Sequence, residues 1–184
     1  MDFFCYHRDR ADSLALRMEL LEDHWSYMDG FVQEMIARGP TVEGEEGVPT
    51  GSVHILTLPD VAAARAFAFD EPGYQAGVYR DVMLRRWRND VGRTMWEFPG
   101  GEPEDDGYLV LGLGAARPVA EAPKLPEAAG LIAFGPLLSD DGEHWLGMIA
   151  MLRASSADEA RAAAVSGDEY AEVEVHQWRF GGRS

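Results

Sequence analysis

The chain has 184 residues, which is long for one compact domain and short for two ordinary ones, so its length leaves the domain count open. Its composition, 46% hydrophobic and 26% charged, excludes a disordered or collagen-like chain and predicts a buried core. A net charge of -16 repels phosphate groups and anionic lipids, so we expect neither nucleic acid nor a membrane as a partner.

The sequence predicts a cytoplasmic protein. No stretch approaches the roughly 18 uncharged apolar residues of a membrane span. The first residues, MDFFCYHRDR, lack the charged-then-apolar order of a signal peptide. The single cysteine, Cys5, excludes an internal disulfide, which fits a reducing compartment, and we interpret it as a small buried apolar side chain.

In chain order, a short β-type run at residues 3–6 is followed by apolar residues at spacings of three and four from Leu14 to Met35, which predict one long helix. Gly39-Pro40 would end this helix, with a strand near Thr41-Val42. A second strand at residues 52–58, a short helix at residues 60–69 and a strand at residues 82–88 complete a β-α-β-β-α-β order. This order predicts an antiparallel sheet with both helices on one face.

The sequence also matches itself, because residues 37–74 align without gaps with residues 133–170. Identical pairs include Gly39 with Gly135, Pro40 with Pro136, Gly51 with Gly147 and Tyr74 with Tyr170. A duplication explains these identities better than chance does. We therefore predict two related units, residues 1–89 and 108–184.

The second unit is expected to be reduced. Its first strand falls at residues 108–113, but Pro118, Pro123 and Pro126 forbid a long helix and leave only a stub near residues 126–131. Residues 90–107 between the units are rich in Pro, Gly and acidic residues, which indicates a surface linker. We expect Trp96 and Phe98 to attach this linker to one of the units.

Three segments in this order resemble the YCII-related domain proteins of the ferredoxin-like, dimeric α/β-barrel superfamily. They are EDHWSYM at residues 22–28, GP followed by GSVHI at residues 39–40 and 51–55, and DEPGYQAGVY at residues 70–79. The last run is one residue longer than the family's usual D-P-Y. The resemblance covers residues 1 to about 90 and implies an α+β fold in which two ferredoxin-like β-α-β-β-α-β units form an intramolecular dimeric α/β-barrel.

The resemblance also implies a site. The family has a histidine-aspartate pair beside a cleft, which corresponds to His24 and Asp70 here, with Ser52 close by. An imidazole can accept and return a proton near pH 7, and a carboxylate on its other nitrogen fixes the tautomer. Asp70 could instead simply close the helix that ends at Phe69.

Further candidates for substrate binding are Ser52, the backbone amide near Gly39, His54, Tyr74 and Tyr79. Each also has a purely structural interpretation: a turn serine, a polar residue at a rim, or tyrosines that only pack. The spacing of His24, His54 and Asp70 matches no known metal motif, so we assign no metal ligand, and the site implies no cofactor.

The second unit lacks these residues. Ser52 aligns with Met148 and Asp70 with Ser166, and no histidine lies between Tyr108 and Leu138. We therefore predict one site per chain. The leading hypothesis is a cofactor-independent enzyme that performs isomerisation, elimination or hydrolysis on a small organic substrate. The alternatives are a non-catalytic ligand-binding or interaction module and a cofactor-free oxygenase-like activity. The chain would act as a monomeric pseudo-dimer or as a homodimer.

Overall fold

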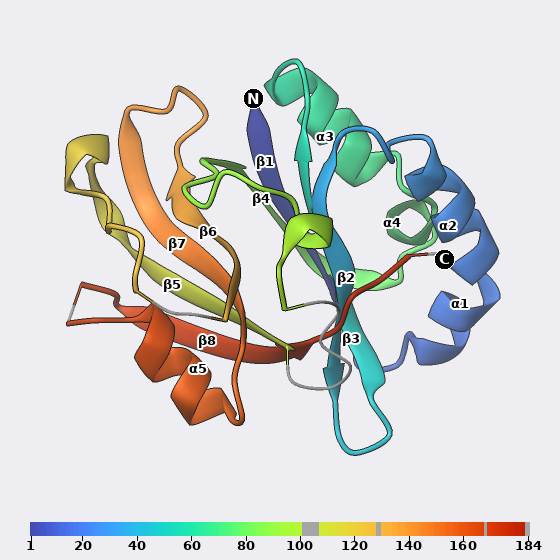
Figure 1. Ribbon diagram of the computed structural model, residues 1–184. Helices are drawn as coiled ribbons and strands as arrows, with labels where there is room; N and C mark the ends of the chain where they lie inside the picture. The colour runs from blue at the N-terminus through green and yellow to red at the C-terminus, as the bar shows by residue number, and fades with distance from the viewer. Residues whose placement is uncertain (101–106, 128–129, 168, 183–184) are drawn as a thin grey trace.

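The computed structural model describes residues 1–100, 107–127, 130–167 and 169–182, and the strands in these residues close into one barrel (Figure 1). The strands are β1 (Asp2–Asp9), β2 (Met35–Glu43), β3 (Val48–Thr57), β4 (Tyr79–Trp87), β5 (Gly107–Pro118), β6 (Leu131–Leu138), β7 (His144–Arg153) and β8 (Glu172–Trp178). The helices are α1 (Leu14–Glu19), α2 (Leu21–Asp29), α3 (Val61–Phe69), α4 (Pro72–Gln75) and α5 (Ala157–Ala164), with short 3-10 turns η1 (Met95–Glu97) and η2 (Val119–Glu121).

The barrel consists of two halves with the same strand order. In the N-terminal half the order is β4-β1-β3-β2, and in the C-terminal half it is β8-β5-β7-β6. The halves meet at two seams, β2 with β8 and β4 with β6, and all these pairings are antiparallel. The seams correspond to each other, because Thr41 pairs with Trp178 in one and Leu137 pairs with Trp87 in the other. This arrangement confirms the predicted α+β class and the two ferredoxin-like units, whereas their origin by duplication stays a prediction.

Strand alternation explains why both faces of each sheet are buried. In β1, Phe4 and Tyr6 belong to the cluster that fills the barrel, while Phe3 and Cys5 belong to the cluster beneath the N-terminal helices. Cys5 is fully buried, as predicted. A third cluster, which includes Val110 of β5, packs the C-terminal sheet against α5.

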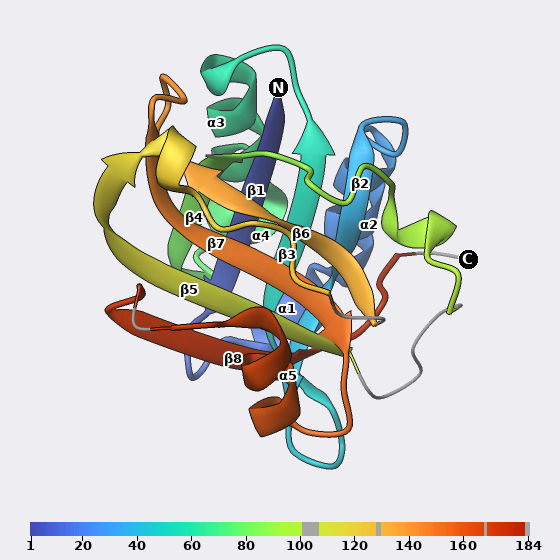
Figure 2. The ribbon, with the colours of Figure 1, turned by 60° about the vertical axis from the view of Figure 1, so that its left-hand side comes forward.

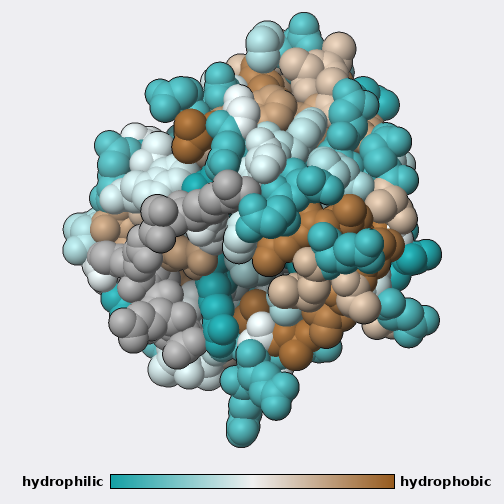
Figure 3. All heavy atoms as spheres, turned by 90° about the vertical axis from the view of Figure 1, so that its right-hand side faces the viewer, coloured by the Kyte–Doolittle hydropathy of each residue, from teal (hydrophilic) through white to brown (hydrophobic). Residues whose placement is uncertain are grey.

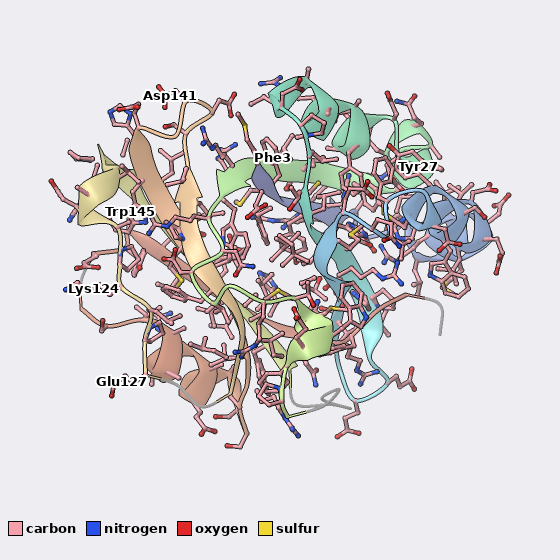
Figure 4. All side chains as sticks on the ribbon, turned by 45° about the horizontal axis from the view of Figure 1, so that its top comes forward. Phe3, Tyr27, Lys124, Glu127, Asp141 and Trp145 are labelled. Atoms are coloured by element: carbon pink, nitrogen blue, oxygen red, sulfur yellow. The ribbon has the colours of Figure 1, made fainter. Side chains whose placement is uncertain are left out.

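The helices cover the outside of the barrel unequally. Figures 1 and 2 show α1 to α4 over the N-terminal half and α5 over the C-terminal half. Asp60 caps α3 by accepting a hydrogen bond from the Ala63 N–H at 2.8 Å, as the sequence indicated. Tyr27 lies on the helical side of the molecule (Figure 4), where its hydroxyl donates to the Phe67 carbonyl at 3.2 Å and so ties α2 to α3.

The long helix predicted from Leu14 to Met35 is wrong in extent. α1 ends at Glu19, α2 runs from Leu21 to Asp29, and Met35 already belongs to β2. Gly39 and Pro40 lie inside β2, where they pair with Val53 and Ser52 of β3. The apolar residues of the turn and of the next strand continue the helical spacing by coincidence, and pairing with β3 overrides the periodic pattern.

The reduced second unit and the linker are partly as expected. The first strand, β5, extends to Pro118, and the residues described after it, up to Glu127, form only η2. Of the stub predicted at residues 126–131, Pro126 and Glu127 are not helical, Leu131 opens β6, and residues 128–129 lie outside the described residues. In the linker, Phe98 is buried in the barrel cluster, whereas Trp96 is 47% exposed; residues 101–106 lie outside the description.

In the part of the chain that the structure describes, no helix is both long and apolar enough to cross a membrane.

Candidate functional site

A histidine-carboxylate pair lies outside the N-terminal sheet, where α2 meets the connection from α3 to α4. His24 Nδ1 in α2 is 2.8 Å from Oε1 of Glu71, the residue that precedes α4. The Glu71 side chain is fully buried, while that of His24 keeps 15% exposure. Because the carboxylate accepts the Nδ1–H hydrogen bond, Nε2 is the ring nitrogen that can exchange a proton with a ligand.

Glu71 is held as an anion by several donors. Its Oε2 accepts a hydrogen bond from the Tyr74 N–H at 2.7 Å, and the Gly73 N–H and the Tyr79 hydroxyl also bond to the carboxylate. Burial alone raises the pKa of Glu71, but the hydrogen bond and charge of His24, together with the two backbone N–H groups, outweigh burial and lower this pKa below its usual value. The pair therefore contains an ionised acid at neutral pH.

This arrangement corrects the predicted partner of His24. Asp70 is exposed and closes α3, where its N–H donates to the Ala66 carbonyl at 2.9 Å, which was the alternative interpretation of this residue. The run Asp70-Glu71-Pro72 contains two adjacent acids, and α4 begins at Pro72. The carboxylate that caps α4 and faces His24 is consequently that of Glu71.

Two further imidazoles lie close to His24. The ring centroid of His54 is 5.6 Å from that of His24 and 6.2 Å from that of His7. His54 is 3% exposed, and among the described residues its buried Nδ1 has no hydrogen-bond partner. Burial, followed by the nearby His24 and His7, lowers the pKa of His54 well below its usual value, so this ring is neutral at pH 7.

His7 has a structural role in this cluster. Its Nε2 lies 2.8 Å from the Ala68 carbonyl, which only accepts, so Nε2 carries the proton. Nδ1 then accepts from the Cys5 thiol, 3.6 Å away. Burial lowers the pKa of His7 and raises that of Cys5, which keeps both side chains neutral. His7 thus connects β1 to the end of α3 and is bonded at both nitrogens.

Ser52, one of the predicted binding residues, is bonded to an arginine. Its Oγ accepts from Arg17 Nη2 at 2.8 Å, and Arg17 Nη1 donates to both Asp9 carboxylate oxygens, at 2.9 and 3.2 Å. Burial raises the pKa of Asp9 although Arg17 favours its charged form. The Arg17 charge is therefore paired inside the protein, and Ser52 is oriented by it.

Of these residues, Arg17, His24, Ser52 and His54 line a pocket of about 320 Å³. Its apolar wall comes from Met18, Leu21, Trp25 and Met28 of the N-terminal helices. On the side of the molecule that carries these helices, Figure 3 shows an apolar area surrounded by hydrophilic residues. The walls suit a small organic molecule, because they exclude water while leaving a few polar groups to orient it.

The opposite wall contains polar groups from β2 and β3 and a segment from the other half. His24, Ser52, His54 and Arg38 line it, as do Phe180, Gly181 and Gly182 beyond β8. Gly39 lies in the same wall and must be glycine, since a Cβ there would come within 1.9 Å of the Arg179 carbonyl oxygen. Among the described residues, no three histidine, cysteine, aspartate or glutamate side chains are arranged to hold a metal ion.

The remaining predicted residues lie outside this pocket. Tyr74 is 39% exposed and packs on Phe69, with ring centroids 5.0 Å apart, and it contributes only its N–H to Glu71. Tyr79 contacts Glu71 and His7 behind His24, and burial with the Glu71 charge raises its pKa, so it remains a donor. Both tyrosines support the pair and do not line the pocket.

Sequence reasoning missed Glu71, Arg17, Arg38 and the segment Phe180–Gly182. The longer D-E-P-G-Y run was a usable signal for Glu71, because the second acid immediately precedes Pro72, a common first residue of a helix. No local pattern marks the two arginines, and the contribution of residues 180–182 depends on the closed barrel.

A larger hollow of about 750 Å³ lies where β1, β2, β3 and β8 meet. Tyr6, Arg8, Thr50, Arg80 and His176 are among its lining residues, and His176 is bonded to Glu174 at 2.8 Å. This hollow does not include His24 or His54, so we place the candidate site in the smaller pocket.

Residues 1–88 match the model of the YCII-related domain family. A 5-chloro-2-hydroxyhydroquinone dehydrochlorinase from Burkholderia phenoliruptrix, solved with 2,5-dihydroxybenzoquinone, is 26% identical over 48% of this chain and 94% of that chain, with a TM-score of 0.46. A protein provisionally named a monooxygenase, from Fusobacterium nucleatum, is 9% identical over 97% of this chain and 91% of that chain, with a TM-score of 0.50.

A second protein with that provisional name, from Lactobacillus acidophilus, is 9% identical over 98% of this chain and 96% of that chain, with a TM-score of 0.49. No curated protein matches the chain. The similarity to the Fusobacterium protein over nearly the whole chain shows the fold alone, which is the predicted α/β-barrel of two ferredoxin-like units.

Proposed function

We propose that this chain, whose residues 1–88 belong to the YCII-related domain family, is an enzyme that transfers a proton on a small organic substrate through His24. Glu71 is the positioning residue of this proposal and replaces Asp70 in that role. The substrate would lie in the pocket between the N-terminal helices and strands β2 and β3.

The observation that carries the proposal is the 2.8 Å contact between His24 Nδ1 and the ionised, fully buried Glu71. Glu71 fixes the tautomer in which Nε2 is the base, and its charge stabilises the imidazolium that forms when Nε2 takes a proton. His24 can then return the proton at another substrate atom or to a leaving group. Isomerisation and elimination both follow this course, and hydrolysis would use the same base on a water molecule.

The surroundings of the pair support this role. The apolar wall, which includes Met18 and Trp25, keeps the reacting atoms away from bulk water. His54 is neutral, so it can hydrogen-bond a polar substrate atom without adding charge, and Ser52 is oriented by Arg17. The pocket thus combines one base with polar groups that can hold a carbonyl or hydroxyl oxygen.

A direct test detects proton abstraction without knowledge of the product. The protein is incubated in deuterated water with phenylpyruvate and a panel of cyclic diketones, and deuterium entry beside the carbonyl is followed by NMR. We expect exchange faster than in buffer, a loss of at least ~100-fold in His24→Gln, and a loss of about 10-fold or more in Glu71→Gln.

Asp70→Asn is the matched control, since Asp70 is exposed and adjacent to Glu71; its exchange rate should equal that of the native protein. An unchanged rate in His24→Gln, or no acceleration over buffer by the native protein, would refute the proposal.

The second candidate is a binding module without turnover. The observation that favours it is the buried Nδ1 of His54, a pocket residue, which has no hydrogen-bond partner among the described residues. Such a module would be stabilised by its ligand and would not exchange the ligand's protons. The same NMR experiment distinguishes the two, because binding shifts protein resonances while the ligand stays undeuterated.

A further inference from the structure

Arg38 is a nearly buried cation that pairs with no acidic side chain among the described residues. It lies in β2, is 8% exposed, and lines the pocket. No aspartate or glutamate among the described residues lies within ion-pair distance of its guanidinium. Asp29 also lines the pocket, and it has an interaction of its own. An unpaired buried charge is costly, which indicates that an anion completes this site when a ligand is bound.

The contacts that Arg38 does make hold it in place without neutralising it. Nε donates to the Gly181 carbonyl at 3.1 Å, and the guanidinium lies 5.8 Å from the centre of the Trp96 ring. Arg17, the other arginine of the pocket, differs because its charge is matched by Asp9. Of the two arginines, Arg38 is therefore the one whose charge is available to a ligand.

The neighbours of Arg38 define what kind of anion would fit. His54 lies directly opposite Arg38 across the β2–β3 pair, and it is neutral, so it adds no competing charge. The wall that faces them is apolar and includes Met18, Leu21 and Trp25. A volume of about 320 Å³ is at the small end of ligand pockets, so the ligand is a compact molecule.

We propose that this pocket binds a small organic carboxylate with an apolar body, and that Arg38 pairs with the carboxylate group. The inference rests on the proposed function for its choice of pocket, but it concerns binding and needs no turnover. Guanidinium suits a carboxylate because two parallel N–H groups meet the two oxygens.

The C-terminal half takes part in this binding site by positioning Arg38. After β8, the Arg179 N–H donates to the Pro40 carbonyl at 3.1 Å and the Gly181 N–H to the Arg38 carbonyl at 3.2 Å, so the segment continues along β2. A Cβ on Gly181 would lie 2.6 Å from the Gly39 Cα, so this close approach requires glycine. The second unit thus supplies both the acceptor for Arg38 Nε and part of the pocket wall.

The test compares benzoate with benzamide, which has nearly the same shape and no charge. Each is titrated into the full-length protein and its dissociation constant is measured by NMR. We expect benzoate to bind at least ~10-fold more tightly than benzamide, because a charge-assisted hydrogen bond contributes about 1.5–3 kcal/mol. Benzoate affinity should also fall as salt is added.

Variants assign the preference to Arg38. Arg38→Gln should lose at least ~10-fold in benzoate affinity and leave benzamide unchanged, while Arg38→Lys keeps the charge and should retain part of the preference. Arg10→Gln removes an exposed arginine that does not line this pocket and is the control for net charge. Thermal unfolding of each variant shows whether it is folded.

The exchange assay on the native protein separates this inference from the proposed function. A preference for benzoate over benzamide that depends on Arg38 would stand even if the native protein catalysed no proton exchange. Equal affinity for benzoate and benzamide, no benzoate binding at tens of millimolar, or full benzoate affinity in folded Arg38→Gln would each overturn the proposal.

Discussion

The two halves pair their second and third strands, β2 with β3 and β6 with β7, in the same register, but the side chains at equivalent positions differ. In the N-terminal half Arg38 lies opposite His54, and at the equivalent place in the C-terminal half Phe134 lies opposite Ala150. Arg38 and His54 line the pocket, whereas Phe134 and Ala150 belong to the apolar cluster under α5. One backbone arrangement therefore supports a polar pocket in one half and ordinary core packing in the other.

The next pair along the strands shows the same contrast. Pro40 faces Ser52 in β2 and β3, while Pro136 faces the fully buried Met148 in β6 and β7. The difference follows from what covers each sheet: α1 and α2 leave a hollow over the first, and α5 packs directly on the second. The register of the strands and the polar residues of the pocket are therefore set by separate parts of the sequence.

The largest expected effect on stability comes from the core of the C-terminal half. Phe134→Ala removes a ring that is 1% exposed in the cluster under α5, and truncations of this kind cost about 4 kcal/mol. Urea unfolding should show a lower midpoint with an unchanged slope. Phe134→Leu, which keeps most of the volume, should recover much of the loss. A cost below about 1 kcal/mol for the alanine variant would mean that this cluster is not the core of the C-terminal half.

A somewhat smaller effect is expected when the buried acid of the N-terminal half is removed. Glu71→Ala leaves His24, the Tyr74 N–H and the Tyr79 hydroxyl without their acceptor, which should cost about 3 kcal/mol of unfolding free energy. Asp70→Asn next to it should change stability by less than about 0.5 kcal/mol, because Asp70 is exposed. Equal effects of the two substitutions would remove the distinction that we draw between these acids.

The smallest expected effect is a pH dependence that belongs to the N-terminal half. Folding lowers the pKa of His54 below its usual value of 6.5. On acidification, His54 therefore binds a proton in the unfolded chain but stays neutral in the folded protein. The unfolding free energy should therefore fall as pH decreases from about 7 to about 5, by up to ~1.4 kcal/mol per pH unit for this group. His54→Ala, which installs the residue found at the equivalent Ala150, should reduce this slope in urea titrations.

His7 contributes in the same direction, since its pKa is also lowered, so the variant should keep a residual slope. Glu71 acts in a separate window: its lowered pKa stabilises the fold above 4.5, and this stabilisation is lost as pH falls further. A slope in His54→Ala equal to that of the native protein between about pH 7 and about pH 5 would contradict the assignment.

Much of the fold was predictable because strand alternation and the repeated pattern are local signals. The strands at residues 52–58 and 82–88 and the helix capped by Asp60 lie close to their predicted places. The long helix from Leu14 to Met35 could not be corrected from the sequence. Its apolar spacing is helical throughout, and only pairing with β3 makes Met35 part of a strand.

The sequence grouped several of the candidate residues correctly but missed others. His24, Ser52, His54 and Gly39 do line one pocket. The partner of His24 depends on where α3 stops and α4 starts, a difference of one residue that decides which of two adjacent acids points inward. Arg38 carries no local signal at all, because its surroundings are created by residues 180–182 at the far end of the chain.

The two seams of the barrel are built alike. A Cβ on Gly39 would lie 1.9 Å from the Arg179 carbonyl oxygen, and a Cβ on Gly135 would lie 1.7 Å from that of Arg88. At each seam, a glycine of one half thus packs against the tryptophan and arginine at the strand end of the other half. Because the two halves belong to one chain, formation of both seams is intramolecular. Assembly of the barrel therefore does not depend on protein concentration. A half expressed alone would expose edges that are complementary to those of a second copy of itself.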